Sequence, residues 1–243
     1  SLMPLPPFTQ MAQPFAKVPP PLPGNVWLIF SFPESGLGFL TAEMFPRIPQ
    51  EREPWDALWP QRVADRRARF VRTIFEKALA AVADCHDAGV AHGSISPASI
   101  TGAPFDQRDP RRLIIQLQDF GFSTQLPGVE PKRRSELIRD DLYALAYAYL
   151  QLLFSSLTTS PNEDDGVFTP ASGMIYDQET LRDIFERKFK MDFKGAGRDW
   201  AYQREEWEHV CKELDGPDDT QEGWKLLHAM INCRGAASRS KGG

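Results

Sequence analysis

The apolar residues of the chain fall into regular patterns, and the clearest of them is helical. Between residues 67 and 88, apolar side chains such as Phe70, Ile74 and Val82 recur every three or four positions. This is the spacing of one face of an α-helix, and Gly89 follows as a natural helix stop. The pattern predicts a long amphipathic helix over 67–88 whose apolar face packs against a core.

A second run, LYALAYAYLQLLF at residues 142–154, is apolar on nearly all sides. A helix of this kind is buried, and the acid pair Asp140 and Asp141 just before it predicts an N-terminal cap. Three further amphipathic helices are expected after it, near 179–190, 199–214 and 221–233.

Two short runs have the composition of strands. NVWLIFSF at residues 25–32 lies between Gly24 and Pro33 and predicts a buried strand, and RLIIQLQ at 112–118 predicts a second one. Few strands among several helices predict an α+β fold that is mostly α-helical.

The first 24 residues differ in composition from the rest. They contain eight prolines between Pro4 and Pro23, which favours an extended polyproline II conformation and cannot build a core. We therefore expect a Pro-rich extended segment over 1–24, lying as a strap or linker against one domain over 25–243. A PxxP ligand at Pro20–Pro23 is the alternative.

Composition narrows the classes of partner. At 243 residues the chain is long enough for a substantial core, and a net charge of −5 argues against nucleic acid as a partner. Basic clusters are interpreted as solvated faces or as loops with nearby acids; they lie at Arg66–Arg67–Arg69, Arg111–Arg112 and Lys132–Arg133–Arg134. No run approaches the roughly 20 apolar residues that cross a bilayer, so we expect no membrane-spanning segment.

The three cysteines are too few and too scattered for a disulfide framework or a zinc site. Cys85 and Cys211 fall on apolar helix faces and are expected in the core. Their use as small core residues predicts a reducing intracellular compartment.

Two short motifs lie between the predicted helices. AHGSISPASI at 91–100 follows the first helix, and QDFGFS at 118–123 follows the strand RLIIQLQ. Together with DDLYALAYAYL, this order resembles the C-terminal lobe of the protein kinase superfamily. There, an H-R-D-L-K-P-E-N loop follows a long helix, a D-F-G follows a strand, and a D-x-Y-S-L-G run opens the central buried helix.

Within that superfamily, NVWLIF, DLYALAYAYLQLLFSSL and the spacing to QEGWKLLHAMI most resemble the chloroplast state-transition (thylakoid) kinases. The resemblance implies a protein-kinase-like C-terminal lobe over about residues 25–240. It also implies a chloroplast location, with the cytoplasm as the alternative.

The resemblance also implies that the chemical positions of the catalytic loop are altered. His92 keeps the His of the motif. In contrast, Ser94 stands where kinases have the catalytic Asp, Ser96 where they have a Lys, and Ser99 where they have the metal-binding Asn. Losing a general base typically lowers a rate by about 10²–10⁴. A serine supplies no positive charge at Ser96 and is a poor magnesium ligand at Ser99.

Three other motif positions are kept. Asp119 holds the acid of the D-F-G, which the resemblance makes a metal ligand, vestigial here because Ser99 replaces its usual partner. Phe120 and Asp141 hold positions that serve packing and hydrogen bonding in kinases. Taken by residue type alone, Asp119 is expected to be hydrogen-bonded within the fold, and His92 to be a core histidine with its bonds satisfied.

An N-terminal lobe is not expected in this chain. Kinases need a lysine on an N-lobe strand, yet no lysine occurs from Val18 to Glu76, and only 24 residues precede NVWLIF. GLGFL at 36–40 matches a glycine-rich phosphate-binding loop only in part. The resemblance makes NVWLIFSF the strand that leads into the hinge between the two kinase lobes, and GLGFL is interpreted as a turn after that hinge. Only 19 residues separate Gly121 from Asp141. In kinases the corresponding activation segment binds the peptide substrate, and this one is short for that role.

These observations lead to the expectation of a pseudokinase. It would be a catalytically inactive kinase-like domain that binds no cofactor and acts as a protein-interaction or scaffold module with protein partners. One alternative is a divergent ATP-dependent Ser/Thr protein kinase whose N-lobe is missing from this chain, which would use Mg-ATP at Asp119. Another is a structural subunit of a larger assembly.

Overall fold

The computed structural model describes residues 40–48, 53–59, 61–158 and 173–233. The chain divides into two units, Ser1–Gly36 and Leu37–Gly243, and every element described below belongs to the second unit. The predicted strand at 25–32, the Pro-rich segment and the glycines at 36 and 38 lie outside the described residues.

Helices make up most of the second unit. They are α1 (Gln61–Asp87), α2 (Pro131–Ser156), α3 (Gln178–Arg182), α4 (Ala196–Tyr202), α5 (Glu208–Asp215) and α6 (Glu222–Asn232), with a π-helical segment at Asp183–Lys188 continuing α3. Short 3-10 turns lie at Ala42–Arg47, Pro54–Ala57, Pro97–Ser99, Pro110–Arg112, Phe120–Phe122, Glu205–Trp207 and Pro217–Asp219.

The strands are short and antiparallel. A three-stranded sheet has the order β1 (Leu40–Thr41), β3 (Ile100–Ala103), β4 (Ile114–Leu117), and a two-stranded ladder joins β2 (Val90–Ala91) to β5 (Thr124–Gln125). The register of the ladder places Val90 opposite Gln125. The fold is therefore α+β and mostly α-helical, as predicted.

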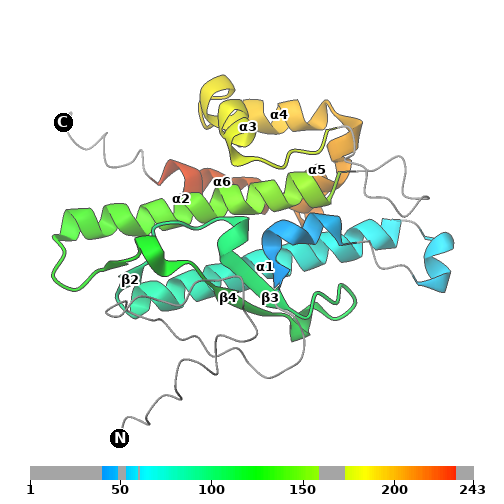
Figure 1. Cartoon of the computed structure of the whole chain (residues 1–243). Coiled ribbons are helices and arrows are strands. Elements are labelled where there is room, and N and C mark those ends of the chain that lie inside the picture. Colours follow the sequence, from blue (N-terminus) through cyan, green and yellow to red (C-terminus); the bar gives the residue numbers. More distant parts are fainter. Residues whose placement is uncertain (1–39, 49–52, 60, 159–172, 234–243) are drawn as a thin grey trace, which may run out of the picture. The chain divides into compact units, whose positions relative to one another are not determined.

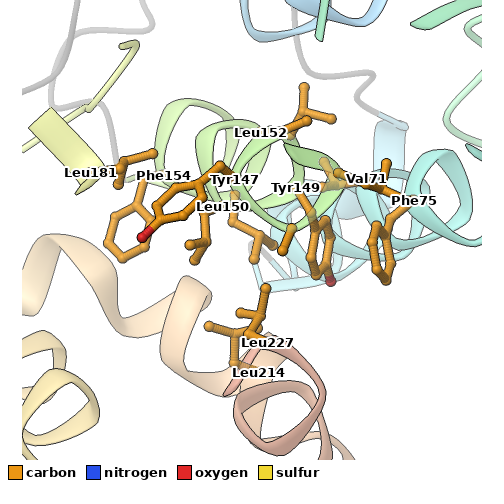
Figure 2. Packing of buried hydrophobic residues seen from close by; sticks show 14 of the residues in the cluster. Val71, Phe75, Tyr147, Tyr149, Leu150, Leu152, Phe154, Leu181, Leu214 and Leu227 are labelled. Carbon is orange, nitrogen blue, oxygen red and sulfur yellow. The ribbon is translucent and has the colours of Figure 1, made fainter. Parts of the chain in front are cut away.

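The core lies between the two long helices and their neighbours. α1 packs on α2, with β4 against α1 and with α3 and α6 against α2 (Figure 1). At the centre, the ring of Phe75 from α1 stacks on Tyr149 from α2 with ring centroids 4.1 Å apart (Figure 2). Leu214 of α5 and Leu227 of α6 are fully buried beneath α2. Such burial contributes about 1.5–3 kcal/mol for each large apolar side chain.

Helix α1 confirms the helix predicted over 67–88 and begins earlier, at Gln61. The first residue of the predicted range, Arg67, is an unexpected buried cation. The guanidinium of Arg67 donates hydrogen bonds to the carbonyl oxygens of Phe45, Pro46, Ile48 and Ser156. The expectation that this basic cluster is a solvated face was thus wrong for Arg67.

The predicted start of the central helix was also wrong. α2 begins at Pro131, ten residues before Asp141, because proline at the first helical position has the φ angle that a helix requires. The first turn of α2 carries exposed charged residues, so no apolar spacing in the sequence indicated that the helix begins there. Asp140 and Asp141 therefore lie inside the helix and do not cap it.

The C-terminal predictions held in part. α6 confirms the helix near 221–233, and α3 with the π-helical segment covers 178–188. The helix expected over 199–214 is broken, since α4 ends at Tyr202 and α5 starts at Glu208. Trp200 and Trp207 pack against each other across this break, with ring centroids 4.4 Å apart.

The two cysteines expected in the core differ in their burial. Cys211 is buried, as predicted, whereas Cys85 is only partly buried. Within the described ranges, none of the helices combines the length and the apolar character that a bilayer span requires.

Candidate functional site

Asp141 of α2 holds the loop that carries AHGSISPASI. Its carboxylate accepts hydrogen bonds from the backbone N–H groups of His92, at 2.7 Å, and Gly93, at 2.8 Å. The imidazole Nε2 of His86, near the end of α1, lies 2.8 Å from the same carboxylate. The end of α1 and the loop just after it therefore meet one buried acid of α2, which lies 48 to 55 positions further along the chain.

The Asp141 carboxyl is ionised in spite of its burial. Burial raises its pKa, but hydrogen bonds from His86, Gly93 and His92 lower it more, and the net pKa lies below the usual value for an aspartate. Hydrogen bonds to the charged form stabilise that form. A buried negative charge thus fixes the backbone of the loop.

His92 is a fully buried histidine with both ring nitrogens engaged. Nδ1 accepts a hydrogen bond from the Ser94 N–H at 3.3 Å, and Nε2 donates to the Gln118 carbonyl oxygen at 2.8 Å. The ring also packs on Phe120, with ring centroids 4.6 Å apart. These bonds select the neutral Nε2–H tautomer, and they confirm His92 as a core histidine with its bonds satisfied.

Gly93 brings the two motifs into direct contact. It has a φ of +79°, and a Cβ atom there would lie 2.5 Å from the carbonyl oxygen of Phe122. Only glycine adopts such a conformation readily and allows this approach. A glycine is thus required at position 93 by the close contact with the turn at 120–122.

The loop serines bind backbone groups of the loop. Ser99 is buried, and its Oγ accepts from the Ser96 N–H at 2.9 Å and donates to the Ser96 carbonyl oxygen at 3.0 Å. Ser94 donates from Oγ to the Asp119 carbonyl oxygen at 3.4 Å. The Ser99 hydroxyl closes the 3-10 turn at Pro97–Ser99, so it does not point into an open site.

Asp119 differs from its surroundings. Its backbone is left-handed, with φ 65° and ψ 50°, and its side chain is exposed. Within the described part of the chain, the Asp119 carboxylate makes no hydrogen bond or ion pair, so the expectation that the fold binds it was wrong. The described residues contain no cluster of three or more potential metal ligands. A magnesium ion at Asp119 would therefore need oxygen ligands from water or phosphate.

Sequence reasoning missed two parts of this arrangement. His86 showed no spacing that pointed to a partner, yet it binds Asp141, 55 positions away. Gln118 contributes through its carbonyl oxygen and also donates from Nε2 to the Ala98 carbonyl oxygen at 2.9 Å. A backbone acceptor leaves no signal in a sequence, and we find no pattern that would have identified either contact.

Comparison of the chain with protein-family models, with curated proteins and with solved structures finds no match.

Proposed function

We propose that this chain is a catalytically inactive kinase-like domain, a pseudokinase with the architecture of a kinase C-terminal lobe, that acts as a protein-interaction or scaffold module. The observation that carries the proposal is the bonding of Asp141. One buried carboxylate holds the backbone of His92 and Gly93, which is the hydrogen-bonding role that the resemblance gives to this acid.

The connection between the two motifs supports the same assignment. The Gln118 carbonyl oxygen and the Phe120 ring both contact His92. These contacts serve packing and hydrogen bonding, and both ring nitrogens of His92 have a hydrogen-bond partner. The positions that would perform phosphoryl transfer instead carry serines, of which Ser99 is used by the loop itself.

A binding role is supported by apolar side chains at the surface. Phe122, in the turn after Asp119, is 77% exposed, and Ile114 on β4 is 57% exposed. Phe120 and Leu40, on the same turn and on β1, are exposed as well. The strand register places Leu40 on the same sheet face as Ile115, and therefore opposite to Ile114. The binding role is thus supported by Ile114 on β4 and by Phe120 and Phe122 in the turn that follows, which are exposed apolar side chains of the kind that interaction sites use.

The test is calorimetry of ATP binding to the purified chain, with and without magnesium. We expect no binding at millimolar ATP and no phosphate transfer to a general protein substrate. Magnesium-dependent binding that disappears in Asp119→Asn, but persists in the surface control Asp183→Asn, would refute the proposal.

The second candidate is a divergent ATP-dependent kinase whose N-lobe lies outside this chain. It is favoured by one observation, the exposed Asp119 carboxylate with no partner among the described residues. Carboxylates that bind magnesium together with phosphates are exposed in this way before ligand binds. The same calorimetry decides between the two candidates.

A further inference from the structure

Three large apolar side chains are exposed where α1 begins, and the site around His92 uses none of them. Trp55 is 51% exposed, Leu58 72% and Trp59 42%. We call these three residues the aromatic ridge. Tryptophan at a surface is a frequent anchor of protein–protein interfaces, and burial in the fold does not account for these side chains.

The ridge is carried by a turn that is held rigidly. The buried carboxylate of Asp56 accepts hydrogen bonds from the Arg66 guanidinium at 2.8 and 2.9 Å and from the Glu53 N–H at 2.7 Å. The Glu53 hydrogen bond, followed by Arg66, lowers the pKa of the Asp56 carboxyl. A pre-organised anchor loses little conformational entropy on binding. The ridge is therefore fixed before any partner arrives.

A groove between α1 and α5 lies further along α1, and the aromatic ridge is not part of its lining. It encloses a cavity of about 380 Å³, and its small lining residues are Ala64, Ala68 and Gly216. Its basic lining residues are Arg69, Arg72 and Lys212. Arg72 is oriented by a bidentate pair with Glu213, at 2.5 and 2.6 Å, whose carboxylate is nearly inaccessible to solvent.

Ridge and groove share one stripe of α1. The Arg62 guanidinium lies over the Trp59 ring, 4.5 Å from its centroid. Arg69 follows Arg62 by seven positions, which places both side chains on the same helix face. The surface thus runs from the exposed indole of Trp59 along α1 to the groove.

The accessible charge of this surface is positive although the protein carries a net charge of −5. Arg62 and Arg69 form no ion pair within the described residues, and Lys212 forms a long one with Asp65 at 3.5 Å. Arg72 and Glu213 neutralise each other. The cations therefore outnumber the accessible carboxylates along the groove.

We propose that the aromatic ridge and the α1–α5 groove form a docking surface for an acidic amphipathic segment of a partner protein. Apolar side chains of the segment pack on Trp55, Leu58 and Trp59. Its carboxylates bind Arg62, Arg69 and Lys212, displacing the weak contact of Lys212 with Asp65. This inference is independent of the kinase-like assignment.

An anionic membrane also attracts tryptophan beside basic residues, but the geometry favours a protein segment. Recognition of acidic lipids typically uses about four to eight clustered lysines and arginines. Here the basic residues line a concave groove between two helices. A peptide chain enters such a groove, whereas a flat bilayer surface contacts only its rim.

The test uses three labelled twelve-residue peptides and the full chain. In the first peptide leucine and phenylalanine alternate with glutamate at helical spacing, in the second glutamine replaces glutamate, and in the third lysine replaces it. Fluorescence anisotropy should show binding of the acidic peptide and of neither other peptide. The affinity for the acidic peptide should fall at least tenfold in 0.5 M salt, because salt screens exposed charge pairs.

Variants locate the binding surface. Leu58→Ser with Trp59→Ala, and separately Arg69→Glu with Lys212→Glu, should each weaken binding at least tenfold, whereas Arg69→Lys should retain most of it. The matched control, Met44→Ser with Leu226→Ser, removes exposed apolar residues elsewhere and should bind as the unaltered chain does. Thermal unfolding confirms that each variant is folded.

Several results would overturn the proposal: no binding of the acidic peptide at millimolar concentration, equal binding of the glutamine peptide, or binding that the surface variants leave unchanged. Anionic vesicles of phosphatidylserine and phosphatidylcholine form the last arm. If these vesicles bind through the same residues while the peptides do not, the surface is a membrane site. None of these outcomes depends on whether ATP binds.

Discussion

Replacing Asp141 with alanine should destabilise the protein more than any substitution of a surface acid. Its carboxylate is almost fully buried and accepts from the N–H groups of His92 and Gly93. In the alanine variant both donors lose their acceptor. The His92 donor is buried, and a buried donor left unsatisfied costs about 1–3 kcal/mol. Gly93 is exposed, so its N–H can bind water instead, and we expect a loss of about 1–3 kcal/mol.

That loss is a substantial part of the free energy of unfolding, which is typically about 5–15 kcal/mol for a domain. Asp141→Asn retains a carbonyl oxygen that accepts one of the two bonds, and we expect about half of the effect. Glu136→Ala, which removes an exposed ion pair with Arg133 from the same helix, should change stability by less than about 1 kcal/mol.

Urea unfolding followed by circular dichroism measures these differences, and hydrogen exchange locates them. In Asp141→Asn the amides of His92 and Gly93 should exchange faster, while those in the middle of α1 should change little. An alanine variant that loses less than about 1 kcal/mol would refute the reasoning, because the buried N–H of His92 would then have found another acceptor.

The same residue gives the protein a stability that depends on pH. The folded pKa of Asp141 lies below its unfolded value, which is about 3.9 for aspartate. Its contribution is therefore present above about pH 4 and is lost as the pH falls through the folded pKa. Below about pH 4, the wild-type chain should lose stability more steeply than Asp141→Asn.

Two further predictions concern buried groups. Arg67→Leu should lower the free energy of unfolding by about 2–4 kcal/mol, because the carbonyl oxygens of Phe45 and Ser156, among others, lose their donor. Urea unfolding measures this change, and an effect no larger than that of Arg69→Leu would contradict the prediction. Burial raises the pKa of Cys211 to about 11 and also raises the pKa of Cys85, which is only partly buried. Iodoacetamide at pH 8 should therefore alkylate the partly buried Cys85 and Cys233 before Cys211, which becomes accessible only on unfolding. Mass spectrometry of timed samples measures the order, and labelling of Cys211 as fast as that of Cys85 would contradict it.

Local pattern predicted the elements whose signal lies in neighbouring residues. The apolar stripe of α1 was read correctly because one helix face packs against a large core, and every third or fourth side chain had to be apolar. The central helix was recognised for the same reason. Its first ten residues were not, because Pro131 and the charged residues after it face solvent and no apolar spacing marks them.

The candidate site was predictable in its parts but not in its connections. The sequence alone determined an α+β chain rich in helix. It also showed two motifs whose order resembles that of a kinase lobe, with serines where the resemblance leads one to expect an aspartate, a lysine and an asparagine. Only the tertiary structure decided that Asp141 binds His92, Gly93 and His86, that Arg67 is buried, and that Trp55 and Trp59 remain exposed. The physical reason is that residue type and spacing limit what a segment can form. Burial and hydrogen-bond partners depend on residues far away in the chain, and these become neighbours only when the helices pack.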